Sequence, residues 1–189
     1  HLDMLVGDIQ SNTQGVLAAA QEALTLHQGN TNRIHCLNHA AEQQGLSRGI
    51  PFSDARAFCP DLQSRPAKPN DDRQSQLALR RWALRYCPWV GLEDDDGLVL
   101  DISGAAHLFG GEVGMLRDIA VRLKMQGLSA RLAMAPTRGA ARMLARFGPA
   151  GCVCGTEDIE VALAPLPVVS LGIGAETDRL LQRLGIKTI

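Results

Sequence analysis

Apolar and polar positions follow two different periods in the middle of the chain. Residues 73–86 place leucines at helical spacing with arginines between them, which predicts an amphipathic helix. Residues 89–92 and 98–102 are short apolar runs on either side of the acidic stretch 94–97, which ends in Asp-Gly and predicts a β-hairpin. Residues 112–125 return to helical spacing. This order of helix, hairpin and helix indicates an α+β protein.

The same alternation continues toward the C-terminus. Residues 129–135 predict another strand, and Pro136 opens a helix that runs to Phe147. The expected order is then helix, strand, strand, helix, strand, helix, which covers most of a ferredoxin-like layer. One more strand is needed. It lies either before the first residue or in the N-terminal stretch, where residues 16–26 are rich in alanine and favour a helix.

The N-terminal third predicts a smaller and mostly helical unit. A strand is expected at residues 33–37, followed by a helix that Asn38 caps and a second helix over residues 54–58 that Ser53 caps. The polar stretch 63–72 contains two prolines, and we expect it to be a linker.

Composition narrows the classes of function. The 189 residues are 46% hydrophobic but only 4% aromatic, so the core is aliphatic, with Trp82 and Trp89 expected as anchors. The formal net charge is -1, so any contact with DNA depends on local basic patches. No apolar run suits a membrane span, and no targeting signal is visible. Five cysteines without zinc-site spacing predict reduced thiols in the cytoplasm.

Three stretches of the chain carry a resemblance to a known family. The first runs from Asn38 through Gly45 and Gly49-Ile50-Pro51 to Cys59-Pro60-Asp61-Leu62. The second joins Tyr86-Cys87-Pro88-Trp89-Val90, Leu100-Asp101-Ile102-Ser103-Gly104 and His107-Leu108-Phe109-Gly110-Gly111. The third joins Leu163-Ala164-Pro165-Leu166-Pro167 with Leu184-Gly185-Ile186. In this order and spacing they resemble Y-family DNA polymerases of the DinB/UmuC type, and specifically their ImuB group.

The resemblance covers residues 33–189 and implies a fold. It implies a ferredoxin-like palm, small helical fingers and the start of a helix-hairpin-helix thumb. The expected parts are an N-terminal palm remnant with fingers over residues 1–70, a palm over 71–155 and a partial thumb over 156–189. We take the chain to be a fragment of a longer protein, and the first palm-strand carboxylate and the steric-gate aromatic are expected outside it.

Active members of this family hold two divalent metals with three carboxylates, one on the first palm strand and an Asp-Glu pair in the hairpin. The strand 100–103 sets the register, so Asp96 falls on the family's Asp and Gly97 on its Glu. Glycine has no side chain with which to bind a metal. An alternative interpretation is that residues 94–97 are simply an acidic hairpin turn.

The triphosphate side of the site also departs from the family pattern. Active relatives carry a Tyr and an Arg in the fingers helix, where this chain has His39 and Glu42, and a Lys after the last palm helix, where it has Gly148 or Pro149. A glutamate repels phosphate, whereas an arginine binds it. The resemblance therefore implies a protein without efficient nucleotide transfer and without a cofactor. Mg²⁺ is expected only if the chain is a low-activity polymerase.

Two sets of cations are expected to contact DNA by neutralising its phosphates. They are Arg138, Arg142 and Arg146, at intervals of four on one predicted helix face, and Arg179, Arg183 and Lys187 around the thumb motif. The alternative for each set is an ordinary solvated helix face.

The resemblance also implies a role. It is that of a catalytically degenerate scaffold in damage-induced (SOS) mutagenic translesion synthesis in the bacterial cytoplasm, at the nucleoid. Its implied partners are primer-template DNA, the sliding clamp, a RecA-related accessory protein and an error-prone C-family polymerase, with no membrane. The alternatives are a low-activity template-directed polymerase and a simple non-specific DNA-binding module.

Overall fold

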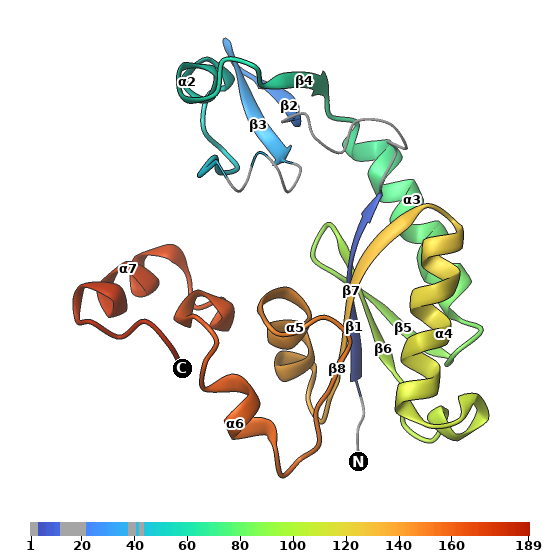
Figure 1. The fold of residues 1–189 in the computed structure, drawn as a ribbon. Coiled ribbons are helices and arrows are strands. Elements are labelled where there is room, and N and C mark those ends of the chain that lie inside the picture. The colour runs from blue at the N-terminus through green and yellow to red at the C-terminus, as the bar shows by residue number, and fades with distance from the viewer. Residues whose placement is uncertain (1–3, 12–21, 38–40, 42–43) are drawn as a thin grey trace. The chain divides into compact units, whose positions relative to one another are not determined.

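The structure is a computed structural model that describes residues 4–11, 22–37, 41 and 44–189. The chain forms two compact units. One consists of His1–Asn12 with Arg73–Ile189, and the other is Thr13–Asp72. The expected α+β fold is confirmed, and each unit has its own sheet (Figure 1).

The strands, in chain order, are β1 (Met4–Ser11), β2 (Glu22–Gln28), β3 (Thr31–Leu37), β4 (Gln63–Pro66), β5 (Trp89–Glu93), β6 (Gly97–Asp101), β7 (Leu128–Ala135) and β8 (Cys152–Val153). The described helices are α2 (Phe52–Phe58), α3 (Pro69–Ala83), α4 (Glu112–Met125), α5 (Arg138–Phe147), α6 (Ile159–Leu163) and α7 (Ala175–Arg183), together with the short 3-10 helices η1 (Ala106–Phe109) and η2 (Val168–Leu171).

The larger unit is built on a five-stranded sheet with the order β5-β6-β1-β7-β8. Strand β1 lies in its middle, antiparallel to β6 on one side and to β7 on the other (Figure 1). Of the two places left open for the missing strand, before the first residue or in the N-terminal stretch, the structure shows the second. The segment carries little local signal, because its place comes from long-range pairing with two strands.

Helices cover both faces of this sheet. Leu98, Leu100 and Met134 point into a core with α3 and α4, whereas Val99 and Ala133 point into a second core with α5. This split follows from the two-residue period of a strand, which sends neighbouring side chains to opposite faces. Each face of the palm sheet is thus buried by different helices.

The contact between α5 and the sheet uses small side chains. Ala133 and Ala135 of β7 are buried against Ala140, Ala141 and Ala145 of α5. Short side chains on both surfaces allow the helix axis to lie close to the strands. This close packing brings the opposite edge of α5 near the β5–β6 hairpin.

The smaller unit has a three-stranded sheet with the order β3-β2-β4. The expectation of a mostly helical unit is wrong, because strands make up more of its described residues than helix does, and two further expectations fail. Residues 22–26 belong to strand β2 rather than to a helix, and the expected linker 63–72 contains β4, which pairs in parallel with β2, and the first turn of α3. Because β4 is an edge strand, it tolerates Pro66, which donates no backbone hydrogen bond.

The helix expected over residues 54–58 is present as α2, but its start differs. Its N-cap residue is Pro51, and no side chain caps it. The Ser53 hydroxyl instead donates to the Asp54 carboxylate at 3.0 Å. The expected helix capped by Asn38 falls almost wholly outside the described residues.

Backbone hydrogen bonds join the last residues of the larger unit to the segment around η2. The Val168 amide donates to the Lys187 carbonyl, and the Ile189 amide donates to the Leu166 carbonyl, both at 3.0 Å. Helix α7 ends in a turn at Gly185, whose φ of 84° suits glycine. The helix-turn expected at the start of a thumb is therefore present.

Trp89 is not a core anchor. Trp89 is 73% exposed, because it is the first residue of β5, an edge strand of the sheet. Trp82 does pack against the palm core. Within the part of the chain that the structure describes, no helix has both the length and the apolar character needed to cross a bilayer.

Candidate functional site at the acidic hairpin

The β5–β6 hairpin is a tight connection whose backbone is fixed from α3. Glu93 pairs with Gly97, which leaves three aspartates, at positions 94 to 96, in the turn. The buried Gln76 side chain donates one hydrogen bond to the Asp94 carbonyl at 3.1 Å and another to the Gly97 carbonyl at 3.0 Å. The expected hairpin is confirmed, with its loop held at both ends by one amide.

Gly97 occupies the position where three strands meet. It pairs with Glu93 on one side and with Asp8 of β1 on the other. Strand β1 therefore runs beside Gly97, the position where the resemblance expects the family's glutamate. Gly97 itself brings no side-chain oxygen to this point.

Helix α5 presents a row of arginines to this hairpin. The helix begins after Thr137, whose hydroxyl oxygen accepts a hydrogen bond from the Ala140 amide at 3.2 Å. Arg138, Arg142 and Arg146 follow at intervals of four and so lie on one face. Because the alanine face of α5 is buried on the sheet, the arginine edge faces the acidic turn.

The innermost carboxylate of the hairpin belongs to Glu93, whose side chain is only 6% exposed. Arg138 donates from Nε to Glu93 Oε2 at 2.7 Å, and Arg142 Nε lies 3.4 Å from the other oxygen. A buried carboxylate is costly unless it is paired with positive charge. These two arginines supply that charge.

The aspartates of the turn complete the cluster. The Asp94 carboxylate lies 3.1 Å from Arg142 Nη2 and 3.2 Å from Arg146 Nη2. Arg146 Nη2 also donates to Asp96 Oδ1 at 2.6 Å. Among the described residues, Asp95 has no ion pair and is exposed. Three arginines thus face three carboxylates, and their charges balance.

This arrangement does not fit a divalent cation. The described side chains contain no group of three His, Cys, Asp or Glu residues placed to hold a metal. Asp96 is bound to Arg146, and Gly97 has no ligand to offer. A metal would have to displace guanidinium groups whose positive charge repels it. The described residues of the hairpin therefore form ion pairs with α5 rather than a metal centre.

The structure brings together several of the predicted site residues but not all of them. Asp96, Gly97 and the arginines of α5 form one cluster. Arg179 and Arg183 are exposed on α7, and Lys187 follows it. His39 and Glu42 lie outside the described residues, so the fingers prediction stays a prediction.

Sequence reasoning missed the partners of the arginines. Gln76 was not singled out, and the acidic turn was not expected to pair with the arginines, although an acidic run and a row of arginines at helical spacing carry opposite charge. Their contact depends on which face of the sheet α5 covers. The opposite charges of the acidic run and the arginine row could have predicted that the two contact each other rather than external ligands.

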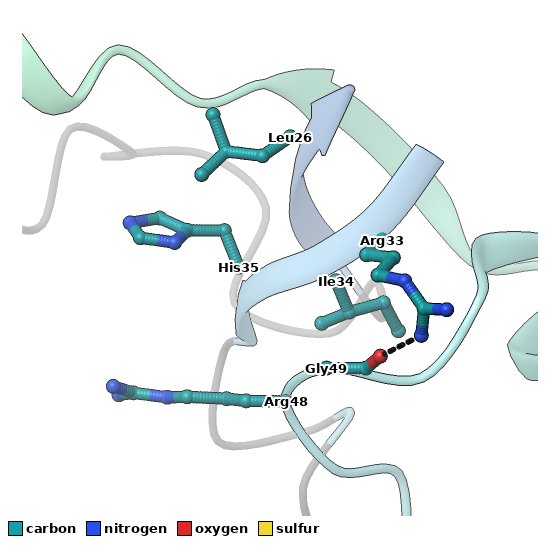
Figure 2. A pocket seen from close by; sticks show the side chains of 6 residues that line it. All are labelled: Leu26, Arg33, Ile34, His35, Arg48 and Gly49. Carbon is teal, nitrogen blue, oxygen red and sulfur yellow. Dashed lines mark hydrogen bonds between the residues drawn. The ribbon is translucent and has the colours of Figure 1, made fainter. Parts of the chain in front are cut away.

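A separate pocket lies in the smaller unit (Figure 2). It has a volume of about 240 Å³ and is lined by Leu26, Arg33, Ile34, His35, Arg48 and Gly49. Arg33 donates to the Gly49 carbonyl at 2.8 Å, so its guanidinium braces the loop before Pro51 against β3. This contact gives Arg33 a structural role within the smaller unit.

Three of the cysteines have thiols that burial keeps in the protonated form. All five are free, and burial raises the pKa of Cys87, Cys152 and Cys154 above the usual thiol value. A raised pKa keeps these thiols protonated, and the thiolate is the form that binds metals and attacks substrates.

The palm sheet, the hairpin beneath α5 and the helix-turn after it define the class of protein, a Y-family DNA polymerase fold. The crystal structure of DinB from Sulfolobus solfataricus matches with a TM-score of 0.82 at 18% identity, over 98% of this chain and 58% of that chain. The insertion ternary complex of Dbh DNA polymerase matches with a TM-score of 0.82 at 17% identity, over 98% of this chain and 58% of that one.

The chain belongs to the impB/mucB/samB family, whose model matches residues 9–146. It is 43% identical to Protein ImuB of Caulobacter vibrioides over 145 residues, which are 77% of this chain and 32% of that protein. It is 30% identical to DNA polymerase IV of Ralstonia nicotianae over 157 residues, 80% of this chain and 43% of that protein. The chain thus spans less than half the length of these relatives. The resemblance to the ImuB group is confirmed.

Proposed function

We propose that the chain is the palm-containing part of a catalytically degenerate Y-family protein, which acts as a scaffold in damage-induced mutagenic DNA synthesis. The observation that carries this proposal is the ion pair between Arg146 Nη2 and Asp96 Oδ1 at 2.6 Å. Asp96 matches the family's metal-binding aspartate, and here an arginine of the same chain holds it. The neighbouring position is Gly97, so the hairpin lacks the second carboxylate as well.

Electrostatics oppose efficient nucleotide transfer at this hairpin. Metal-assisted transfer needs carboxylate oxygens that can hold two divalent ions against the attacking and leaving oxygens. Glu93, Asp94 and Asp96 instead have guanidinium partners in the folded chain. We therefore propose that no cofactor is used.

The role of the fold is then to hold DNA and other proteins. We infer that the exposed cations on and after α7, Arg179, Arg183 and Lys187, contact DNA phosphates without reading sequence. By family resemblance, the sliding clamp, a RecA-related accessory protein and an error-prone C-family polymerase are the proposed protein partners. The proposed location is the bacterial cytoplasm, at the nucleoid, under the SOS response.

Primer extension tests the proposal directly. The full-length protein is incubated with primed DNA, nucleotides and Mg²⁺ or Mn²⁺, beside Gly97→Glu and Asp96→Ala variants, and DNA binding is measured in the same samples. We expect bound DNA and no extension by the parent protein. We also expect none by Gly97→Glu, because the arginines of α5 remain in place.

The opposite result has a definite meaning. If the parent extends the primer and Asp96→Ala abolishes the extension, the hairpin forms a working metal site despite Gly97. The chain is then a low-activity template-directed polymerase, and the scaffold proposal is wrong.

A further inference from the structure

One oxygen of Asp94 bridges two arginines of α5. Asp94 Oδ2 lies 3.1 Å from Arg142 Nη2 and 3.2 Å from Arg146 Nη2. A single anionic oxygen between two guanidinium groups is also how a phosphate oxygen is held between arginines. The carboxylate thus stands where a phosphate oxygen would fit.

Asp94 differs from the other two carboxylates of the cluster in its exposure. Its side chain is 51% exposed, compared with 6% for Glu93 and 23% for Asp96. Exposed ion pairs contribute little to stability because water screens them. Glu93 and Asp96 therefore hold α5 to the hairpin, whereas the Asp94 contact is the weakest of the three.

The backbone around Asp94 does not have to move when its side chain leaves. Gln76 holds the Asp94 carbonyl, and the residue sits in the left-handed region with a φ of 49°. The side chain can therefore rotate into solvent while the turn keeps its shape. Arg142 and Arg146 keep Glu93 and Asp96 as partners and need only exchange one anion for another.

We propose that Arg142 and Arg146 form a binding site for a DNA backbone phosphate, and that Asp94 occupies this site as an internal carboxylate when no DNA is bound. The inference rests on the proposed DNA-holding function and adds its regulation. It explains how a chain with a net charge of -1 keeps an arginine-rich surface shielded until a nucleic acid competes for it.

The test compares two neighbouring aspartates in the full-length protein. Asp94→Asn removes the bridging charge, and asparagine tolerates the left-handed conformation. Asp95→Asn removes the same charge one residue away, where the structure shows no ion pair with a described residue. Binding to primed DNA is measured by fluorescence anisotropy across salt concentrations, after thermal unfolding has shown that both variants are folded.

We expect Asp94→Asn to bind DNA more tightly than Asp95→Asn and to respond more steeply to salt. Each additional duplex phosphate that the protein neutralises steepens the log-log salt dependence by about 0.9, which is about a 3.5-fold larger loss of affinity over a fourfold rise in salt. An Arg142→Gln change should then cost more affinity in the Asp94→Asn background than in the parent, because only there is the arginine released from the Asp94 carboxylate.

The outcomes separate this inference from the proposed function. If the parent binds DNA and the two asparagine variants gain equally, Asp94 does not shield a phosphate site and the inference alone is overturned. If neither the parent nor any variant binds DNA, the DNA-holding proposal fails and this inference fails with it. A gain specific to Asp94→Asn that Arg142→Gln cancels supports both.

Discussion

The buried side-chain amide of Gln76 holds the acidic turn of the candidate site in shape. It donates to the carbonyls at both ends of the acidic turn and accepts a hydrogen bond from Arg73. Gln76→Ala leaves two carbonyls without this donor, and we expect it to lower the free energy of unfolding by about 1–3 kcal/mol. Denaturant unfolding measures the change, with the exposed neighbour Gln74→Ala as control. Equal stability of the two variants would contradict the bracing role.

Tyr86 is the only tyrosine of the chain, so its ionisation can be followed without interference. Burial, and then its hydrogen bond to the Asp118 carboxylate at 2.6 Å, raise the pKa of Tyr86 above the usual value. Because the folded pKa lies above the unfolded one, the stabilisation is complete below about pH 10 and is lost as pH rises through the folded pKa.

We therefore expect the folded protein to show no phenolate absorbance at about pH 10, where an unfolded chain is half ionised. The measurement is an ultraviolet titration in buffer and again in denaturant. Tyr86→Phe serves as the blank and should also flatten the alkaline loss of stability. An ordinary phenolate titration in the native protein would show that the buried hydrogen bond is absent.

Asp118, the hydrogen-bond partner of Tyr86, should make the stability of the fold depend on pH in the acidic range. Hydrogen bonds from Arg122 and then from Tyr86 lower the pKa of its carboxyl group. A lowered folded pKa gives stability that is present above the unfolded value of about 4 and is lost as pH falls through the folded pKa. We expect Asp118→Asn to reduce the loss of stability on acidification, as measured by thermal unfolding between about pH 2 and 6. If Asp118→Asn leaves the pH dependence of thermal unfolding unchanged, the Asp118 carboxylate does not contribute this stability.

At the scale of elements, α5 is the part that positions the arginines, and its start depends on one cap. Thr137 accepts a hydrogen bond from the Ala140 amide. We expect Thr137→Ala to lower the free energy of unfolding by about 1 kcal/mol, because the first turn loses a partner for its amides. Thr137→Ser keeps the hydroxyl and should restore most of the stability in denaturant unfolding. A serine variant as weak as the alanine variant would assign the effect to packing instead.

The elements that sequence patterns predicted well are those with a full local signal. The helix over residues 112–125 has the observed bounds of α4, and the hairpin and β7 were found within a residue or two. Strands β1 and β4 were missed, because the first is defined by two distant partners and the second hides in a proline-containing polar stretch. Local periodicity carries no information about such partners.

The same distinction applies to the candidate site. The sequence showed an acidic turn with Gly97 and a row of arginines on a helix, each correctly placed in its own element. It did not show that they face each other, because that depends on which face of the sheet α5 packs against. The small alanines that bring α5 close to β7 determine this geometry, and their role appears only in three dimensions.

At the scale of the whole molecule, the distribution of charge decides which cations are left to meet an external anion. The formal net charge is -1, and three arginines of the larger unit are matched by its own carboxylates. Arg179 and Arg183 are exposed on α7 and are one turn apart. These residues are therefore candidates for the proposed contact with phosphate.

We expect the double change Arg179→Gln and Arg183→Gln to weaken DNA binding and to lower the log-log salt slope by about 0.9 for each duplex phosphate that is no longer neutralised. The matched control is Arg81→Gln with Arg117→Gln, two exposed arginines on other helices, which changes the net charge equally. Anisotropy titrations at several salt concentrations distinguish them. Equal weakening by the two pairs would mean that only overall charge matters.

The ion pairs between α5 and the hairpin also constrain how this lineage can change. A Gly97→Glu change adds a carboxylate while the arginines still hold the existing ones. Losing Arg138 or Arg142 first leaves the buried Glu93 with less counter-charge, which destabilises the fold, whereas losing Arg146 releases Asp96 but leaves Gly97 without a carboxylate. Under the proposed function, metal-dependent chemistry at this hairpin therefore needs more than one change in the cluster, whereas the surfaces of the palm can change one residue at a time.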